Sequence, residues 1–206
     1  PVTLELGGKS PALVTRNYPV ADAARRITHG KSSNSRQICV SPDYALVPRE
    51  HMDAFIAGVR QSFRKFYDGR TDGNPDYTAV VNERQLQRMQ AVLEDARAKG
   101  ARVESCAPMP GAGRQMPLQI VTGMRPDMRI LSEELFGPIL PVVPYDTLDD
   151  ALAFINERPR PLALYCFSHD ATERAHVLRH THSGGVSIND WGWHVVNHHA
   201  PFGGIR

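Results

Sequence analysis

Apolar and polar residues along this chain follow two repeating patterns that divide it into short segments. In the first, several consecutive residues are apolar, often β-branched or aromatic, which is typical of buried strands. In the second, apolar residues recur every three or four positions, which is typical of a helix that buries one face. The clearest helical pattern covers residues 82–99, and Gly100 suits its C-terminal cap. The apolar face of this helix comprises Leu86, Met89, Val92, Leu93 and Ala96.

These patterns predict strands and helices that alternate along the chain. We expect strands at residues 2–6, 12–14, 40–47, 118–122, 139–145, 162–168 and 186–189. We expect helices at residues 21–29, 48–67, 82–99, 148–156 and 171–181. Such alternation predicts an α/β fold, a layered domain with a mostly parallel sheet flanked by helices. Chemistry in such sheets gathers at strand ends, where the patterns place Glu5 at the end of one strand and Cys39 at the start of another.

The composition and net charge of the chain limit the kinds of partner that it is expected to bind. The 206 residues carry a formal net charge of +2, which is too small to argue for nucleic acid or an anionic membrane surface. No apolar run approaches the roughly 20 residues that a membrane span needs. Three cysteines do not form an even disulfide framework, which favours a reducing compartment. We therefore expect a cytoplasmic protein with no nucleic-acid partner and no membrane partner.

One cysteine and one glutamate stand in distinctive short motifs. Cys39 ends the run Asn-Ser-Arg-Gln-Ile-Cys, and Glu5 begins the run Glu-Leu-Gly-Gly-Lys-Ser-Pro, 34 residues upstream. A thiol needs a base or a lowered pKa to attack a carbonyl, and a thioester needs a base that activates water. The two residues can supply both steps. By contrast, Cys166 is interpreted as a small buried apolar residue and Cys106 as a loop cysteine without chemical consequence.

Three later segments complete a set of motifs. Residues 133–138 read Glu-Glu-Leu-Phe-Gly-Pro, and residues 201–204 read Pro-Phe-Gly-Gly. Together with the motifs of Cys39 and Glu5, and in the same order, they resemble the signatures of the NAD(P)-dependent aldehyde dehydrogenase superfamily. Residues 156–165 resemble the branch that includes fatty, aromatic and coniferyl aldehyde dehydrogenases. The resemblance covers almost the whole chain.

The resemblance implies a sequence of attack, hydride transfer and hydrolysis. The Cys39 thiolate adds to the aldehyde, hydride leaves to the nicotinamide, and water activated by Glu5 releases the acid from the thioester. The backbone N–H of Cys39 serves as one donor to the developing oxyanion. The alternative is that Glu5 is an ordinary surface carboxylate on a strand, without a catalytic role.

The resemblance also implies a cofactor site. Glu134 is similar to the residue that holds the nicotinamide ribose hydroxyls, and Phe136 to the ring that packs beside the nicotinamide; the alternative is a pair of acids at a helix start with a buried Phe. Relatives carry a dinucleotide-binding domain before this region and an oligomerising tail after it. We therefore expect residues 1–206 to be the catalytic-domain part of a longer dehydrogenase, inactive alone, with NAD or NADP held in the parent protein.

Substrate-side residues follow from the same motifs. We expect Asn34, Arg36, Asn189 and Trp191 to lie on the aldehyde side. Two neighbouring tryptophans, Trp191 and Trp193, favour an apolar or aromatic aldehyde such as coniferyl aldehyde. The alternative is that both indoles pack in the core or at a subunit interface. We expect a small-molecule aldehyde as substrate and a homo-oligomer as the assembly.

Histidines near the end of the chain do not predict a metal site. His194 and His198 are four residues apart, which is a usable ligand spacing on a helix. However, Pro201 and two glycines follow at once, and no third ligand has motif spacing. We therefore expect no metal.

One residue departs from the family pattern. Relatives usually have Gly at the position of Arg36, between the Asn and the Gln that precede the nucleophile. A long charged side chain there either obstructs the aldehyde or the nicotinamide, or points outward and lowers the pKa of Cys39. We favour impaired or altered activity, and Arg36→Gly should then raise turnover in the full-length protein. Lys9 is interpreted as a surface cation.

Two other functions remain open at this stage. One is ester hydrolysis without cofactor, in which Cys39 is acylated and Glu5 drives deacylation. The other is a truncated pseudo-enzyme that acts as a folded partner or oligomerisation module. Selective reaction of Cys39 with thiol reagents separates the enzymatic functions from the module.

Overall fold

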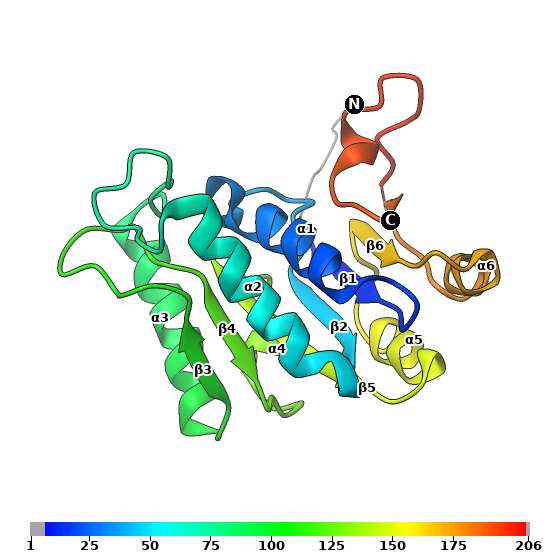
Figure 1. Ribbon diagram of the computed structural model, residues 1–206, viewed down its shortest axis with the longest axis horizontal. Helices are drawn as coiled ribbons and strands as arrows, with labels where there is room; N and C mark the ends of the chain where they lie inside the picture. The colour runs from blue at the N-terminus through cyan, green and yellow to red at the C-terminus, as the bar shows by residue number, and fades with distance from the viewer. Residues whose placement is uncertain (1–6, 205–206) are drawn as a thin grey trace.

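A computed structural model describes residues 7–204 of the chain, and the predicted strand at residues 2–6 lies outside that range. Seven strands and six α-helices follow one another in an α/β order (Figure 1). The strands are β1 Pro11–Val14, β2 Tyr44–Pro48, β3 Arg102–Ser105, β4 Gln119–Thr122, β5 Ile139–Tyr145, β6 Ala163–Phe167 and β7 Gly185–Ile188. The helices are α1 Val20–Ser32, α2 Met52–Tyr67, α3 Glu83–Ala98, α4 Arg129–Ser132, α5 Leu148–Asn156 and α6 Ala171–His180. Short 3₁₀ turns are η1 Ser33–Arg36, η2 Arg49–His51 and η3 Trp193–Val195.

The strands form one sheet in the order β3-β4-β5-β2-β1-β6-β7. All neighbours pair in parallel except β3 and β4, which are antiparallel. Ala45 of β2 lies opposite Ala12 of β1 on one side and Val142 of β5 on the other. The carboxyl ends of parallel strands meet at one edge of such a sheet, which is where loops with chemistry gather.

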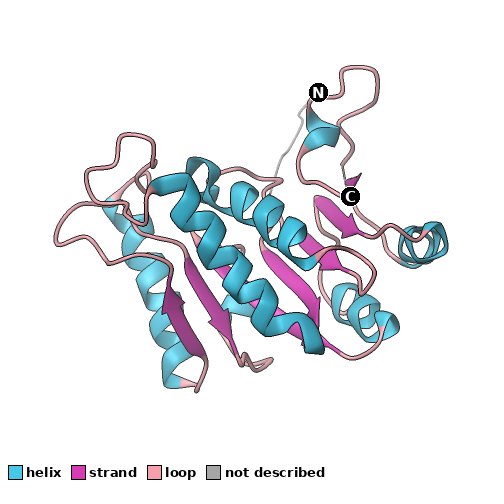
Figure 2. Ribbon diagram, viewed as in Figure 1, coloured by secondary structure: helices cyan, strands magenta, loops and turns pink. Residues whose placement is uncertain are grey.

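Helices cover both faces of the sheet (Figure 2). Side chains alternate between the faces along each strand. Ala12 and Val14 of β1 pack in one core under α1 and α2, while Leu13 points to the opposite face and packs with residues of α5 and α6. A third core lies between α3, α4 and the β4–β5 side of the sheet. Burial of both faces explains why the strands read as continuous apolar runs rather than as alternating ones.

The expected α/β fold with a mostly parallel sheet is confirmed, and most elements lie within a few residues of their predicted bounds. Two predictions need correction. The antiparallel edge strand β3 was not predicted, because its residues are only partly buried and include charged side chains. The strand after Cys39 begins at Tyr44 rather than at residue 40, so Cys39 lies in a turn ahead of β2 and not at the strand start.

Candidate functional site

The segment between α1 and β2 has an unusual backbone. Asn34, Ser35 and Arg36 have φ values of +49°, +51° and +62°, all in the left-handed region. Residues other than glycine and asparagine rarely adopt the left-handed conformation. Three consecutive residues in this conformation therefore need support from other parts of the protein. The side chain of Gln37 supplies part of it, since it donates to the carbonyl of Ala79 at 3.1 Å and accepts from the N–H of Val81 at 2.8 Å.

Cys39 is half-buried in the turn that follows. It packs against the core under α1 and α2, and it forms no disulfide. Behind it, the hydroxyl of Tyr165 on β6 donates to the carbonyl of Val40, and the hydroxyl of Ser41 donates to the carbonyl of Gly30 at 2.5 Å. Burial raises the pKa of Tyr165, so this phenol remains a donor at neutral pH. The turn that carries Cys39 is therefore anchored to the sheet and to α1.

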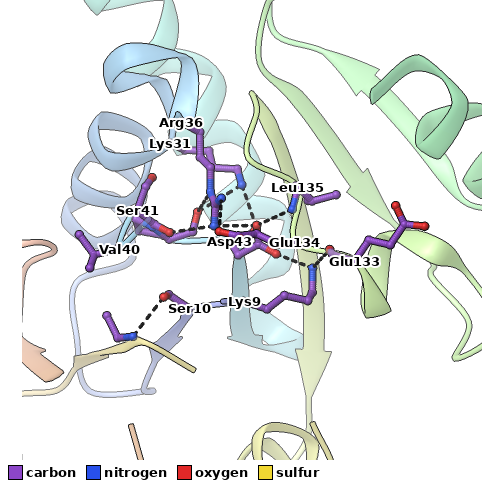
Figure 3. A network of polar contacts seen from close by, with 12 residues as sticks. Lys9, Ser10, Lys31, Arg36, Val40, Ser41, Asp43, Glu133, Glu134 and Leu135 are labelled. Atoms are coloured by element: carbon purple, nitrogen blue, oxygen red, sulfur yellow. Dashed lines mark hydrogen bonds and ion pairs between the residues drawn. The ribbon is translucent and has the colours of Figure 1, made fainter. Parts of the chain in front are cut away.

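A buried network of charges lies beside this turn (Figure 3). The carboxylate of Asp43 is fully buried and accepts from Lys9, from the guanidinium of Arg36 at 2.8 Å and from the backbone N–H of Leu135 at 3.2 Å. Burial favours the neutral acid, but the charges of Arg36, Lys9 and Lys31 outweigh it and hold the pKa of Asp43 below its usual range. Asp43 is therefore ionised and joins three segments of the chain.

The two lysines of the network donate to backbone carbonyls as well. Lys9 donates to the carbonyls of Ile130 at 3.0 Å and Glu133 at 2.7 Å, and Lys31 donates to that of Asp43 at 2.9 Å. Burial lowers the pKa of Lys31 well below its usual range, and the charges of Arg36 and Lys9 lower it further, against the opposing effect of Asp43. The interpretation of Lys9 as a surface cation is wrong, because its side chain is 11% exposed and ion-paired.

Arg36 is fully buried and does not point outward. Its guanidinium donates to Ser41 at 3.1 Å, pairs with Asp43, and lies 3.3 Å from Oε1 of Glu134. It also lies 5.8 Å from the centre of the Phe136 ring. Arg36 thus links the turn of Cys39 to the Glu-Glu-Leu-Phe-Gly-Pro segment.

Glu134 borders a cavity of about 580 Å³ that is also lined by Gly7, Gly8 and Lys9. Burial raises the pKa of Glu134 above its usual value, although the nearby Arg36 charge opposes this. A Cβ at Gly7 would lie 2.1 Å from Oε2 of Glu134 and would force this carboxylate to shift, and the φ of +78° at Gly7 also favours glycine. The carboxylate is therefore held between the Gly-Gly segment and Arg36.

Phe136 is not a buried core residue. Its φ is +47° and the residue is 39% exposed. The next position, Gly137, is filled from behind by Met89, whose sulfur would lie 1.8 Å from a Cβ there. The alternative of a buried Phe after helix-start acids is wrong, since Phe136 is exposed and Glu133 follows α4 as its C-cap.

A second, mainly apolar cavity of about 490 Å³ lies at the turn that carries Cys39, although Cys39 itself is not among its lining residues. Ile38 and Val40, the two neighbours of Cys39 in sequence, line it together with Trp191 and Trp193. The Trp191 indole N–H donates to Nδ1 of His29 at 3.0 Å, and its rings pack over Gly30 in α1, where a Cβ would lie 2.7 Å away.

Ion pairs fix the wall of this apolar cavity. Arg26 of α1 bonds Asp22 at 2.8 Å and Asp190 at 2.5 Å, and Asp190 also accepts from the Trp193 indole at 2.8 Å. Partial burial raises the pKa of Asp22, but hydrogen bonds from Tyr18, Arg26 and Arg25 outweigh it and lower the pKa to about 2. The segment with both tryptophans is thereby tied to α1.

The structure brings some of the predicted site residues together and separates others. Trp191 lines the cavity beside Cys39, and Arg36, Glu134 and Phe136 form a second group. Three further substrate-side predictions, Asn34, Arg36 and Asn189, fall outside the lining of the apolar cavity. Asn34 is exposed, and its amide donates to the carbonyl of Gln37 at 3.1 Å.

Asn189 caps the sheet instead of facing the apolar cavity. Its side-chain oxygen accepts from the N–H of Ser168 at 2.8 Å, and its φ is +60°. Glu5, predicted as the general base, lies outside the described residues.

His194 has a local structural role. Its Nδ1 lies 2.9 Å from the hydroxyl of Ser187, and its ring packs on Gly185, where a Cβ would lie 2.4 Å away. Burial lowers its pKa. Within residues 7–204, no group of three or more His, Cys, Asp or Glu side chains is arranged to hold a metal ion.

Sequence reasoning missed the residues that hold the site together. Asp43 and Lys31 are the main ones, together with Tyr165 and His29. A possible signal was the charged Asp43 directly before the apolar strand β2, because a carboxylate at the edge of a buried strand needs a partner. Nothing in the sequence identified that partner.

The chain is similar to known proteins along its whole length. The model of the family described as "Aldehyde dehydrogenase family" matches residues 1–206. A protein of Pseudomonas aeruginosa described as "Probable coniferyl aldehyde dehydrogenase" is 49% identical over 207 residues, covering 100% of this chain and 43% of that protein. The chain thus spans less than half the length of this curated relative.

Solved structures show the same fold. The substrate-bound state of Staphylococcus aureus AldH superimposes with a TM-score of 0.92 and 37% identity, covering 100% of this chain and 44% of the other. An NADP-dependent glyceraldehyde-3-phosphate dehydrogenase from Bacillus halodurans, solved in complex with NADP, gives a TM-score of 0.82 and 27% identity over 91% of this chain and 39% of that one. Across residues 7–204, none of the helices has the length and apolar character to cross a membrane.

Proposed function

Because the chain belongs to the aldehyde dehydrogenase family, we propose that it carries the nucleophile and the nicotinamide-side residues of an NAD(P)-dependent enzyme. We propose that this enzyme oxidises coniferyl aldehyde, or an aromatic aldehyde like it, to the carboxylic acid. The observation that carries the proposal is the position of Cys39 between Ile38 and Val40, which line an apolar cavity walled by Trp191. The activity is proposed for the complete protein that carries this chain.

The apolar cavity supports an aromatic substrate. Its volume of about 490 Å³ is within the range of small-molecule sites, and its lining is mainly apolar with a few charged groups at Arg25, Arg26 and Asp190. An aromatic ring gains contact area and a favourable ring geometry beside an indole such as that of Trp191. The charged groups can bind polar substituents on the ring, as a phenolic aldehyde has.

The residues at Glu134 fit a nicotinamide cofactor. A carboxylate accepts hydrogen bonds from two neighbouring ribose hydroxyls, and an exposed ring such as Phe136 orients a flat heterocycle. Glu134 lines a cavity large enough for part of a dinucleotide, with Gly7 and Gly8 allowing close approach, and Phe136 follows it two residues later in the sequence. A nicotinamide cofactor, when bound, supplies the acceptor for the hydride of the aldehyde. NAD and NADP are equally compatible with this end of the site.

The residues of the chain perform the remaining chemistry in our proposal. The Cys39 sulfur bonds to the aldehyde carbon, and the carbonyl oxygen becomes an oxyanion that the backbone N–H of Cys39 stabilises. Loss of hydride from that carbon leaves a thioester on Cys39. Glu5 then takes a proton from water, the hydroxide bonds to the thioester carbon, and the C–S bond breaks to release the acid and the thiolate.

The test is oxidation of coniferyl aldehyde by the complete protein with NAD or NADP. The acid product is measured by chromatography, so that cofactor absorbance does not interfere. We expect Cys39→Ala to reduce turnover by about 10⁴-fold or more, as for other activated nucleophiles. The matched control, Cys106→Ala, should keep most of the activity, because Cys106 directly follows β3 and, unlike Cys39, has no sequence neighbour that lines either cavity. Normal turnover in Cys39→Ala would refute the proposal.

A further inference from the structure

Arg36 holds the carboxylate that our proposed function gives to the cofactor. Its Nη1 lies 3.3 Å from Oε1 of Glu134 (Figure 3). The other carboxylate oxygen, Oε2, packs against the backbone of Gly7. Oε1 is thus engaged by Arg36 and Oε2 lies close to the Gly-Gly segment, although the side chain borders the cavity of about 580 Å³.

Arg36 does not obstruct either cavity sterically. The residue is fully buried, and it is absent from the lining of both cavities described above. A group without surface in a cavity cannot contact a ligand there unless it moves. Any influence of Arg36 on a ligand must therefore pass through a residue that does border the cavity, and Glu134 is the one it touches.

Arg36 keeps its other buried partners if the side chain of Glu134 rotates away from it. Its Nη2 stays paired with Asp43 at 2.8 Å and with the carbonyl of Ser41 at 3.1 Å, so the guanidinium is not left without a partner. The contact with Glu134 is the longest of its ion pairs and the one nearest solvent, since the Glu134 side chain is 24% exposed and that of Asp43 fully buried. Arg36 therefore has one buried ion pair, with Asp43, that stays in place, and one ion pair, with Glu134, that a ligand can replace.

We propose that Arg36 is a positioning residue that competes with the nicotinamide ribose hydroxyls for Glu134, so that this chain binds the ribose weakly. The inference rests on the proposed cofactor role of Glu134. Ribose hydroxyls that hydrogen-bond to Glu134 must displace its charge-assisted contact with Arg36 rather than a water molecule. The net gain in binding free energy is therefore smaller. With Gly in place of Arg36, the carboxylate is available to the ribose, and the strained φ of +62° is relieved.

The first experiment needs no variant of Arg36. Binding of NAD to the complete protein is compared by calorimetry with binding of NAD analogues that lack the 2′- or 3′-hydroxyl of the nicotinamide ribose. The measurements are made at about pH 8, well above the usual pKa of a glutamate, because burial raises the pKa of Glu134. If Arg36 occupies Glu134, removing a hydroxyl weakens binding less than about threefold. A loss of about tenfold or more, the size expected for a hydrogen bond to a charged group, would overturn the inference.

The second experiment repeats the comparison in Arg36→Gly and Arg36→Asn, since both residues tolerate a positive φ. We expect NAD to bind about tenfold more tightly in both variants, and loss of a ribose hydroxyl now to cost about tenfold. The control is Arg49→Gln, which removes an arginine from a surface pair with Asp146 and should change neither quantity. If the Arg36 variants fold and bind NAD no more tightly than the wild type, the inference is wrong.

Glu134→Gln separates failure of the inference from failure of the proposed function. In the Arg36→Gly background, this change should weaken NAD binding about tenfold, and in the wild-type background it should have little effect. A strong effect in both backgrounds keeps the cofactor role of Glu134 and rejects the competition by Arg36. No effect in either background rejects the cofactor role itself.

Discussion

The guanidinium of Arg36 lies 2.8 Å from the carboxylate of Asp43, and both side chains are fully buried. The pair connects the turn that carries Cys39 to the start of β2, and Lys9 connects the same carboxylate to the segment around Glu133. The turn of Cys39 and the segment that contains Glu133 and Glu134 are thus joined through one buried acid (Figure 3). Such networks are sensitive to the loss of a single member, because the remaining charges stay buried.

Asp43→Asn is expected to destabilise the fold strongly. The change leaves the positive charges of Arg36 and Lys9 without their buried counter-charge, which typically costs about 3 to 5 kcal/mol. Urea unfolding followed by circular dichroism measures the loss. Asp146→Asn is the matched control, because Asp146 pairs with Arg49 at 2.7 Å on the surface and its loss should leave the midpoint almost unchanged. Equal midpoints for the two variants would contradict the central place of Asp43.

Native protein should contain one fast-reacting thiol. Burial raises the pKa of Cys106 and of Cys166 to about 12, so at neutral pH both thiols are protonated, and Cys166 is in addition fully buried. Cys39 is half-buried in a turn, packs against the core under α1 and α2, and is flanked by Ile38 and Val40, which line the apolar cavity. Iodoacetamide should therefore label Cys39 first, with one equivalent in native protein and three after denaturation. Peptide mapping identifies the site, and preferential labelling of Cys106 would count against Cys39 as the nucleophile.

Tyr165→Phe is expected to affect both stability and turnover. The carbonyl of Val40 loses its buried donor, which costs about 1 to 3 kcal/mol, and the turn of Cys39 becomes less well positioned. We expect kcat to fall about tenfold through poorer orientation of the thiolate. Tyr145→Phe is the control, since Tyr145 also donates from a buried site to a backbone carbonyl, that of Val14 at 2.7 Å. It should lose similar stability but keep kcat; an equal fall in kcat would remove the special role of Tyr165.

Trp191→Ala is expected to change substrate preference. The variant removes an indole from the cavity wall next to Cys39, so the KM for coniferyl aldehyde should rise about tenfold while that for propanal changes little. Trp193→Ala should have a smaller effect, because Trp193 is 64% exposed. Steady-state kinetics with coniferyl aldehyde and with propanal measure the two KM values. Equal changes in KM for the two substrates would indicate that Trp191 only supports the packing of α1.

The alternation of strands and helices could be predicted from the sequence because both faces of the sheet are buried, which makes the strands continuous apolar runs. The helix at Glu83–Ala98 was predictable to within a residue or two, since Asn82 caps it and its apolar face repeats regularly. Edge strand β3 was not predictable, since an edge position with a half-exposed face leaves little apolar signal.

The site could be predicted only as far as local motifs reach. Cys39, Glu134 and Trp191 stand in such motifs, and the structure places each of them at a cavity or beside residues that line one. The partners of Arg36 could not be predicted, because Glu134 lies 98 residues away and meets it only through the order of strands in the sheet. Asn189 was predicted from its neighbours in sequence, but its side chain satisfies the N–H of Ser168.

The most direct test of the account is to trap the acyl-enzyme. The complete protein with the substitution Glu5→Gln is mixed with coniferyl aldehyde and NAD, and the reaction is quenched in acid. The protein is then digested, and the masses of the peptides are measured by mass spectrometry. We predict that the peptide with Cys39 carries the mass of the acyl group in thioester linkage, at close to one equivalent, and that hydroxylamine removes it. Acylation of another residue, or aldehyde oxidation with no adduct on Cys39 and full activity in Cys39→Ala, would contradict the account.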